Sequence, residues 1–88
     1  MTVETNIEET RSQIAAIDAE LVELVNRRLK LVDALWAWKR ENGEPIRSPE
    51  REEWLLQHLI ASNRGPLSED GVRRLHATVL ELIRSELE

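Results

Sequence analysis

Residues 7–42 read IEETRSQIAAIDAELVELVNRRLKLVDALWAWKREN and contain neither proline nor glycine. Apolar residues recur there in steps of three, four and seven, and we call this set the seam: Ile7, Ile14, Ile17, Leu21, Leu24, Leu31, Leu35 and Trp38. Such spacing is typical of a helix that packs lengthwise against other helices. The stretch therefore predicts one long helix, which would measure about 54 Å at 1.5 Å per residue.

Two shorter helices are expected after it. The long helix should end near Asn42-Gly43, a common carboxyl-terminal signal. Ser48, followed by proline, has the character of an N-cap and predicts a second helix that ends near Asn63. After a turn, Ser68 is expected to cap a third helix that continues to the end of the chain.

Composition and pattern together indicate an all-α fold. Helix-forming residues dominate, and runs that alternate polar and apolar residues are absent. Eighty-eight residues make one domain near the lower size limit for a single core, and we assign residues 1–88 to it, with 1–6 frayed. Two short helices can cover only part of the seam. We therefore expect an intertwined antiparallel homodimer, in which a second copy covers the remainder.

The composition excludes several functional classes. With 17 acidic and 12 basic residues the chain has a net charge of −5, which disfavours non-specific nucleic-acid binding. There is no cysteine, and no grouping of residues suggests a metal site. The amino terminus lacks the features of a signal peptide, and no apolar run reaches membrane-spanning length. The expectation is a cytoplasmic protein without membrane or nucleic-acid partners.

Charged residues on the long helix suggest an anion-binding site. Arg28 interrupts the seam, and Lys39 follows it three turns later, at a distance of about 16 Å along the axis. Arg11 is too distant to join them within one chain, but in an antiparallel dimer the partner's copy would lie opposite their midpoint. The second helix would bring Ser48, Arg51 and Glu52 near Lys39. Four cations and one carboxylate would then surround a pocket suited to a small dicarboxylate.

An ordered set of residues resembles the all-helical (AroQ-type) chorismate mutases. The set covers residues 7–60 and comprises Arg11-x-x-Ile14-x-x-x-Asp18, Leu21, Arg27-Arg28, Lys39, Pro45-Ile46-Arg47 and Arg51-Glu52. The resemblance implies a homodimer with two sites, each of which borrows an arginine from the partner chain. It also implies an isomerase of aromatic amino acid biosynthesis that rearranges chorismate to prephenate without a cofactor.

The resemblance also implies a role for each candidate residue. Arg28 and the partner's Arg11 would hold one carboxylate, and Lys39 would bond both a carboxylate and the ether oxygen. Glu52 would accept a hydrogen bond from the ring hydroxyl. The predicted catalytic residues are Arg28, Lys39 and Glu52, and the predicted substrate-binding residues are Arg11, Ser48 and Arg51.

The chain departs from the family pattern at two places. Ser48 stands where many relatives have an aspartate that also contacts the ring hydroxyl. Near the carboxyl terminus, relatives carry a serine and then a glutamine or glutamate that completes the contact with the ether oxygen. Alignment of the apolar stripe places Ile83 and Leu87 there, whereas a one-residue shift offers Arg84 and Glu88. We favour the Leu87 register, which buries one set of apolar residues together: Val72, Leu75, Val79 and Leu82.

Other interpretations are compatible with the same residues. Arg28 could be a polar residue that fixes helix register, and Arg11 could be a solvated surface arginine. The substrate could be a relative of chorismate, either 4-amino-4-deoxychorismate for a mutase or isochorismate for a lyase. The chain could also be a weakly catalytic helical dimer that binds another shikimate-pathway enzyme.

Overall fold

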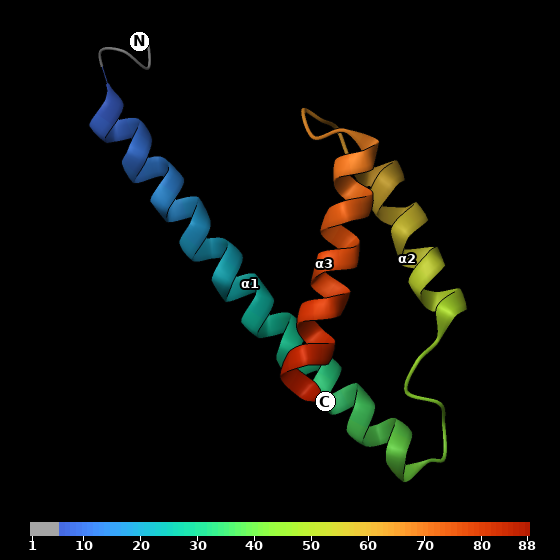
Figure 1. The fold of residues 1–88 in the computed structure, drawn as a ribbon. Helices are drawn as coiled ribbons and strands as arrows, with labels where there is room; N and C mark the ends of the chain where they lie inside the picture. Colours follow the sequence, from blue (N-terminus) through green and yellow to red (C-terminus); the bar gives the residue numbers. More distant parts are fainter. Residues whose placement is uncertain (1–5) are drawn as a thin grey trace. The chain divides into compact units, whose positions relative to one another are not determined.

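The computed structural model describes residues 6–88 and shows three α-helices with no strand among those residues (Figure 1). The helices are α1 (Ile7–Glu41), α2 (Pro49–Ser62) and α3 (Glu69–Leu87). The predicted all-α class and all three predicted helices are confirmed, and every boundary agrees within one residue. Of the six residues expected to be frayed, 1–5 lie outside the described residues. The carbonyl of Asn6 accepts a hydrogen bond from the amide of Thr10 at 2.9 Å.

The chain divides into two compact units, Met1–Val32 and Asp33–Glu88. In the first unit, the described residues are Asn6 and the part of α1 that ends at Val32. A single helix cannot bury its own apolar stripe, and no residue of α1 is buried. Ile14 is 53% exposed and Leu31 is 73% exposed. The seam residues from Ile7 to Leu31 are therefore present as an apolar face on the helix of this unit.

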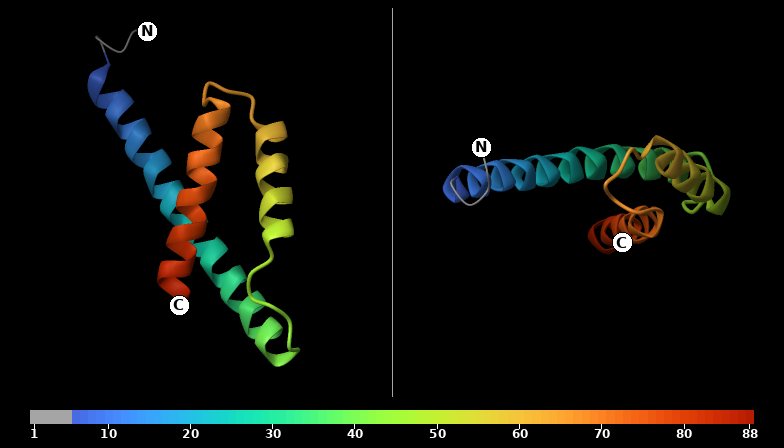
Figure 2. Two further views of the ribbon diagram at one scale, coloured as in Figure 1. Left: turned by 45° about the vertical axis from the view of Figure 1, so that its right-hand side comes forward. Right: turned by 90° about the horizontal axis from the view of Figure 1, so that it is seen from above.

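The second unit contains a helical hairpin. Helices α2 and α3 lie side by side and antiparallel (Figure 2). Val72 and Ile83 of α3 form the buried apolar centre, with 5% and 3% of their surfaces exposed. His76 is buried beside them, and α2 contributes a half-buried apolar stripe: Leu55, Leu56, Leu59 and Ile60.

The turn between these helices is held by side-chain hydrogen bonds. The Asn63 amide donates to the carbonyl of Leu67 at 2.7 Å, and its oxygen accepts from the amide of Gly65 at 3.1 Å. Gly65 has a φ of +77°, a conformation that favours glycine. Ser68 then caps α3 by accepting from the amide of Gly71 at 3.0 Å, as the sequence predicted.

The register of α3 differs from the one we favoured from the sequence. Leu75 is 54% exposed and Leu82 is 40% exposed, whereas Ile83 is buried. The prediction that Leu75 and Leu82 are buried together with Val72 and Val79 is therefore wrong for the hairpin. The physical reason is that α2 covers the face of α3 that carries Val72, His76 and Ile83. Leu75 and Leu82 lie on a flank that α2 does not reach.

None of the helices in residues 6–88 is both long and apolar enough to cross a membrane.

The observed register predicts unequal costs for two neighbouring truncations. Ile83→Ala should lower the free energy of unfolding by about 2–5 kcal/mol, because it leaves a cavity in the centre of the hairpin. Leu82→Ala removes a side chain that is 40% exposed and should cost clearly less. Chemical denaturation of both variants and the parent chain measures the difference. A larger loss for Leu82→Ala would contradict this register.

Candidate functional site

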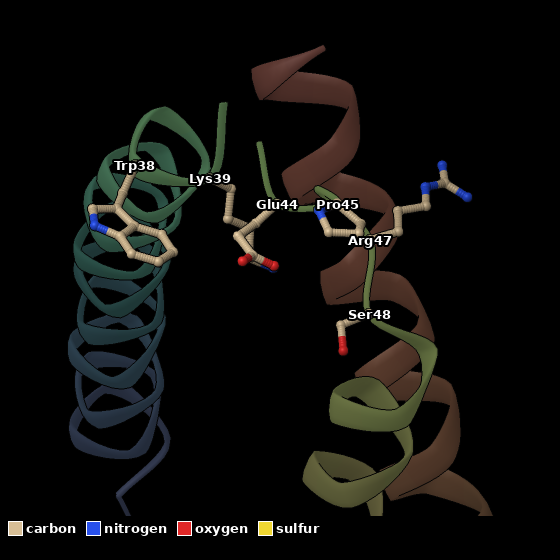
Figure 3. Close-up of a pocket in the computed structure, with 6 residues that line it drawn as sticks. All are labelled: Trp38, Lys39, Glu44, Pro45, Arg47 and Ser48. Carbon is tan, nitrogen blue, oxygen red and sulfur yellow. The ribbon is translucent and has the colours of Figure 1, made fainter. Parts of the chain in front are cut away.

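A pocket lies where α1 ends and the chain turns toward α2 (Figure 3). Gly43, with a φ of +69°, ends the helix, and the amide of Glu44 donates back to the carbonyl of Lys39 at 2.8 Å. The pocket has a volume of about 390 Å³, within the usual range for a small-molecule site. All of its lining residues belong to the second unit: Trp38, Lys39, Glu44, Pro45, Arg47 and Ser48.

Lys39 is held in place on the wall of this pocket. Its Nζ donates a hydrogen bond to the carbonyl oxygen of Ile46 at 3.1 Å, and the side chain is half-buried. An ammonium group has three donors, so two remain for a ligand. The contact with Ile46 fixes the charge at the pocket before any ligand arrives. Of the three residues predicted near Lys39, Ser48 lines the same pocket, whereas Arg51 and Glu52 do not line it.

Ser48 lines the same pocket and also caps α2. Its hydroxyl oxygen accepts from the amide of Arg51 at 3.4 Å, and Pro49 occupies the first helical position. A serine supplies a hydroxyl but no charge to this wall. The cap explains why the sequence places serine here, and the pocket explains how the same residue could contact a ligand.

Glu52 lies one turn beyond Ser48 and faces α3. Its Oε1 accepts a hydrogen bond from Nη2 of Arg84 at 2.5 Å, and the two side chains are 32% and 28% exposed. A second ion pair, between Arg47 and Glu88 at 3.9 Å, joins the residue two positions before α2 to the residue that follows α3. The Arg47 guanidinium points away from the pocket (Figure 3). The carboxyl-terminal turn of α3 therefore lies against the start of α2.

Arg84 is a residue that our prediction of the site omitted. The signal was present in the sequence, because a one-residue shift of α3 offered Arg84 and Glu88 in place of Ile83 and Leu87. The structure places Ile83 in the core and Arg84 beside Glu52, which matches the shifted register. Trp38, which the seam pattern assigns to packing, also lines the pocket.

Arg51 is held by a neighbouring aromatic ring. Its guanidinium carbon lies 4.1 Å from the centroid of Trp54, a cation–π contact. The Trp54 ring stacks in turn on His58, with 5.1 Å between centroids and 7° between planes. Arg51 is exposed and does not line the pocket.

The two remaining predicted residues belong to the first unit. Arg11 is exposed and pairs with Glu8 across one turn of α1 at 3.2 Å. Arg28 is half-buried on the same helix. Within residues 6–88, no group of histidine or acidic side chains is arranged to hold a metal ion.

The second unit by itself defines the class of protein. It is all-helical, and the wall of its pocket carries a fixed ammonium group, a helix-capping hydroxyl and the carboxylate of Glu44. Glu52, paired with Arg84, follows one turn beyond this wall and does not line the pocket. The Lys39 ammonium can bind an anionic group of a ligand, and the hydroxyl and carboxylate beside it can hydrogen-bond to a polar one.

Comparison with known families identifies the chain. A family model described as chorismate mutase type II matches residues 10–87, and the chain belongs to this family. The resemblance inferred from the sequence is thereby confirmed. The match includes all six predicted site residues and extends across both compact units.

Curated relatives carry the matching segment inside longer proteins. The T-protein of Haemophilus influenzae is 40% identical over 73 residues, which cover 77% of this chain and 19% of that protein. A bifunctional chorismate mutase/prephenate dehydratase of Pseudomonas aeruginosa is 33% identical over 75 residues, which cover 80% of this chain and 20% of that protein. The chain thus spans about a fifth of the length of these relatives.

Solved structures of similar size share the fold. Form II of the chorismate mutase from Thermus thermophilus superposes with a TM-score of 0.86 at 28% identity and covers 90% of each chain. Form I of the same protein gives a TM-score of 0.85 and covers 88% of this chain and 96% of that one.

Proposed function

We propose that this chain is a chorismate mutase, which converts chorismate to prephenate by a Claisen rearrangement. The observation that carries the proposal is the family match over residues 10–87, because that segment contains every residue of the predicted cationic site. The pocket with its fixed Lys39 supports it independently, since chorismate is a small dicarboxylate with a ring hydroxyl.

The reaction suits side chains of this kind. A pericyclic rearrangement breaks one C–O bond and forms one C–C bond within a single molecule, and it needs neither a nucleophile nor a general base. Catalysis then depends on holding the reactive conformer and on stabilising the negative charge that develops on the ether oxygen. Fixed cations and hydrogen-bond donors perform both tasks.

Each predicted residue has a role in this proposal. Lys39 uses its two free N–H donors on a carboxylate and on the ether oxygen. Glu52 accepts from the ring hydroxyl through the carboxylate oxygen that Arg84 does not occupy. Arg51, steadied by Trp54, positions the other end of the substrate. Arg28 and the partner's Arg11 hold one carboxylate.

We further propose that the active form is an intertwined antiparallel homodimer. The apolar face of α1 within the first unit supports this, because an uncovered stripe of this kind requires a partner surface. The family match across both units supports a single domain over residues 1–88. We also propose a cytoplasmic location for the protein, as expected for an enzyme of the shikimate pathway.

The alternatives differ in what they require of the site. A mutase for 4-amino-4-deoxychorismate would need an acidic group near the amino substituent, and Ser48 supplies none. Glu52 favours a substrate with a hydroxyl at that position. A weakly catalytic dimer that binds another shikimate-pathway enzyme is the second candidate. This binding role is favoured by relatives such as the bifunctional chorismate mutase/prephenate dehydratase, whose name joins a chorismate mutase to a second enzyme.

Purified protein mixed with chorismate should remove the diene absorbance of the substrate and yield prephenate. Arg28→Ala and Lys39→Ala should each lower kcat/KM by several powers of ten, and each tenfold loss corresponds to about 1.4 kcal/mol of transition-state stabilisation. The helical circular dichroism of both variants should stay unchanged. Arg40→Ala, which changes an exposed neighbour, serves as the control. Turnover of isochorismate or 4-amino-4-deoxychorismate instead of chorismate would assign one of the alternative substrates.

Light scattering at micromolar concentration should give twice the mass of the 10.2 kDa chain. The expectation follows from the exposed seam of α1, which a second copy would cover. Replacement of Leu21 or Leu24 by glutamate should shift the protein toward monomer, because a charge would then be buried at the interface. A well-folded monomer of the parent chain would rule out a site formed by two chains.

Mixed chains test the arginine contributed by the partner. An Arg11→Ala chain combined with an Arg28→Ala chain should recover activity, since one site of the heterodimer carries both lesions and the other carries neither. Differently tagged chains allow the heterodimer to be isolated before the assay. Verified heterodimers that stay inactive would falsify the assignment of Arg11 to the neighbouring site.

Ser48→Asp tests whether this residue contacts the substrate. Aspartate preserves the helix cap and adds an acceptor for the ring hydroxyl, so KM should hold or decrease. Ser48→Ala is the matched control, which removes the cap and should cost about 1 kcal/mol of stability. A large rise in KM for the aspartate variant would mean that Ser48 does not face the bound substrate.

A further inference from the structure

Glu44 is an acidic residue of the pocket wall that the proposed function leaves unused. It lines the pocket together with Lys39, and Figure 3 shows both side chains extending into the space between the end of α1 and the connection to α2. The backbone of Glu44 is fixed there, because its amide donates to the carbonyl of Lys39 at 2.8 Å. Within residues 6–88, no ion pair or side-chain hydrogen bond engages its carboxylate. The carboxylate can therefore act on a ligand in the pocket.

The charges that face this pocket have opposite signs. Three of the lining residues are charged: Lys39, Glu44 and Arg47. The Arg47 guanidinium points away from the pocket, and Arg47 pairs with Glu88 at 3.9 Å. One cation and one anion of this wall remain to face a ligand. The proposed substrate carries two carboxylates, and a second carboxylate placed beside Lys39 would also meet the negative charge of Glu44.

We propose that Glu44 sets the charge selectivity of this pocket: its carboxylate opposes a second anionic group beside Lys39 and favours a cationic group there. This inference rests on the proposed function, in which Lys39 binds one carboxylate of chorismate. Charges separated by the width of a small pocket interact appreciably even near a protein surface. Glu44 thereby also restricts how the substrate is oriented, because the end with the second carboxylate is disfavoured next to the connection between α1 and α2.

A solvated carboxylate without this role makes a different prediction. A distant acidic group affects an anionic ligand only weakly, since salt screens exposed charges beyond about 8–10 Å. Glu41 provides the comparison, because it is exposed, ends α1 and does not line the pocket. If Glu44 were only a surface group of this kind, neutralising it would have the same effect as neutralising Glu41.

The experiment compares two ligands that differ by one charge. Chorismate has a ring hydroxyl where 4-amino-4-deoxychorismate has an ammonium group, and the amino analogue serves as a probe of charge whether or not the chain rearranges it. The measured quantities are the KM of chorismate and the Ki of the analogue against chorismate turnover. Glu44→Gln keeps the shape of the side chain and removes its charge. The KM should fall and the Ki should rise, so that their ratio changes by roughly threefold to tenfold.

Two further variants and the ionic strength complete the test. Glu41→Gln should leave the ratio within about twofold of the parent, and Glu44→Asp, which retains the charge, should stay closer to the parent than Glu44→Gln does. The effect of Glu44→Gln should shrink when salt is raised from about 0.1 M to about 1 M, because the screening length falls from about 10 Å to about 3 Å.

The role of Glu44 is overturned if Glu44→Gln changes the ratio no more than Glu41→Gln, if Glu44→Asp behaves like Glu44→Gln, or if the change is equally large at both salt concentrations. These outcomes leave the proposed function intact, because the parent chain converts chorismate in each of them. A parent chain that does not convert chorismate overturns the proposed function and this role together.

Discussion

An amphipathic helix has to cover its apolar stripe, and the rest of this structure depends on how α1 meets that requirement. In the first unit the helix is the element described, and its side chains at Ile14, Leu21 and Leu31 are more than half exposed. Exposure of a continuous apolar face is costly in water, at roughly 25 cal/mol per Å². A second copy of the chain is the cover we propose, and two sites that each combine residues of both chains follow from it.

Three charged side chains of the second unit are held in place before a substrate is present. Lys39 is held by the carbonyl of Ile46, Arg51 by the ring of Trp54, and Glu52 by Arg84. Side chains that are already oriented lose less entropy when a ligand binds, and their dipoles need not reorganise as charge develops. This would matter for the pericyclic reaction that we propose, in which the protein contributes orientation and electrostatic stabilisation rather than a covalent step.

Ion pairs connect the hairpin to the wall of the site. Glu52 with Arg84 and Arg47 with Glu88 join the carboxyl-terminal turn of α3 to the connection and first turn of α2. The packing of α2 against α3 through Val72 and Ile83 thus sets which residue of α3 reaches Glu52. A shift of one residue in this packing would exchange a guanidinium for an apolar side chain beside Glu52.

The sequence by itself determined the all-α class, the three helices and their caps at Ser48 and Ser68, because local spacing and capping residues specify them. It also determined the family, since the ordered cations and Glu52 lie within the matched residues 10–87. It did not determine the register of α3, where Leu75 and Leu82 have the same helical spacing as the buried residues. Only the packing of α2 distinguishes the two faces, and it buries Ile83 and places Arg84 beside Glu52. Helical periodicity identifies an apolar stripe. The choice between adjacent stripes of α3 depends on contacts with α2, such as the one between Arg84 and Glu52, which are 32 positions apart in the sequence.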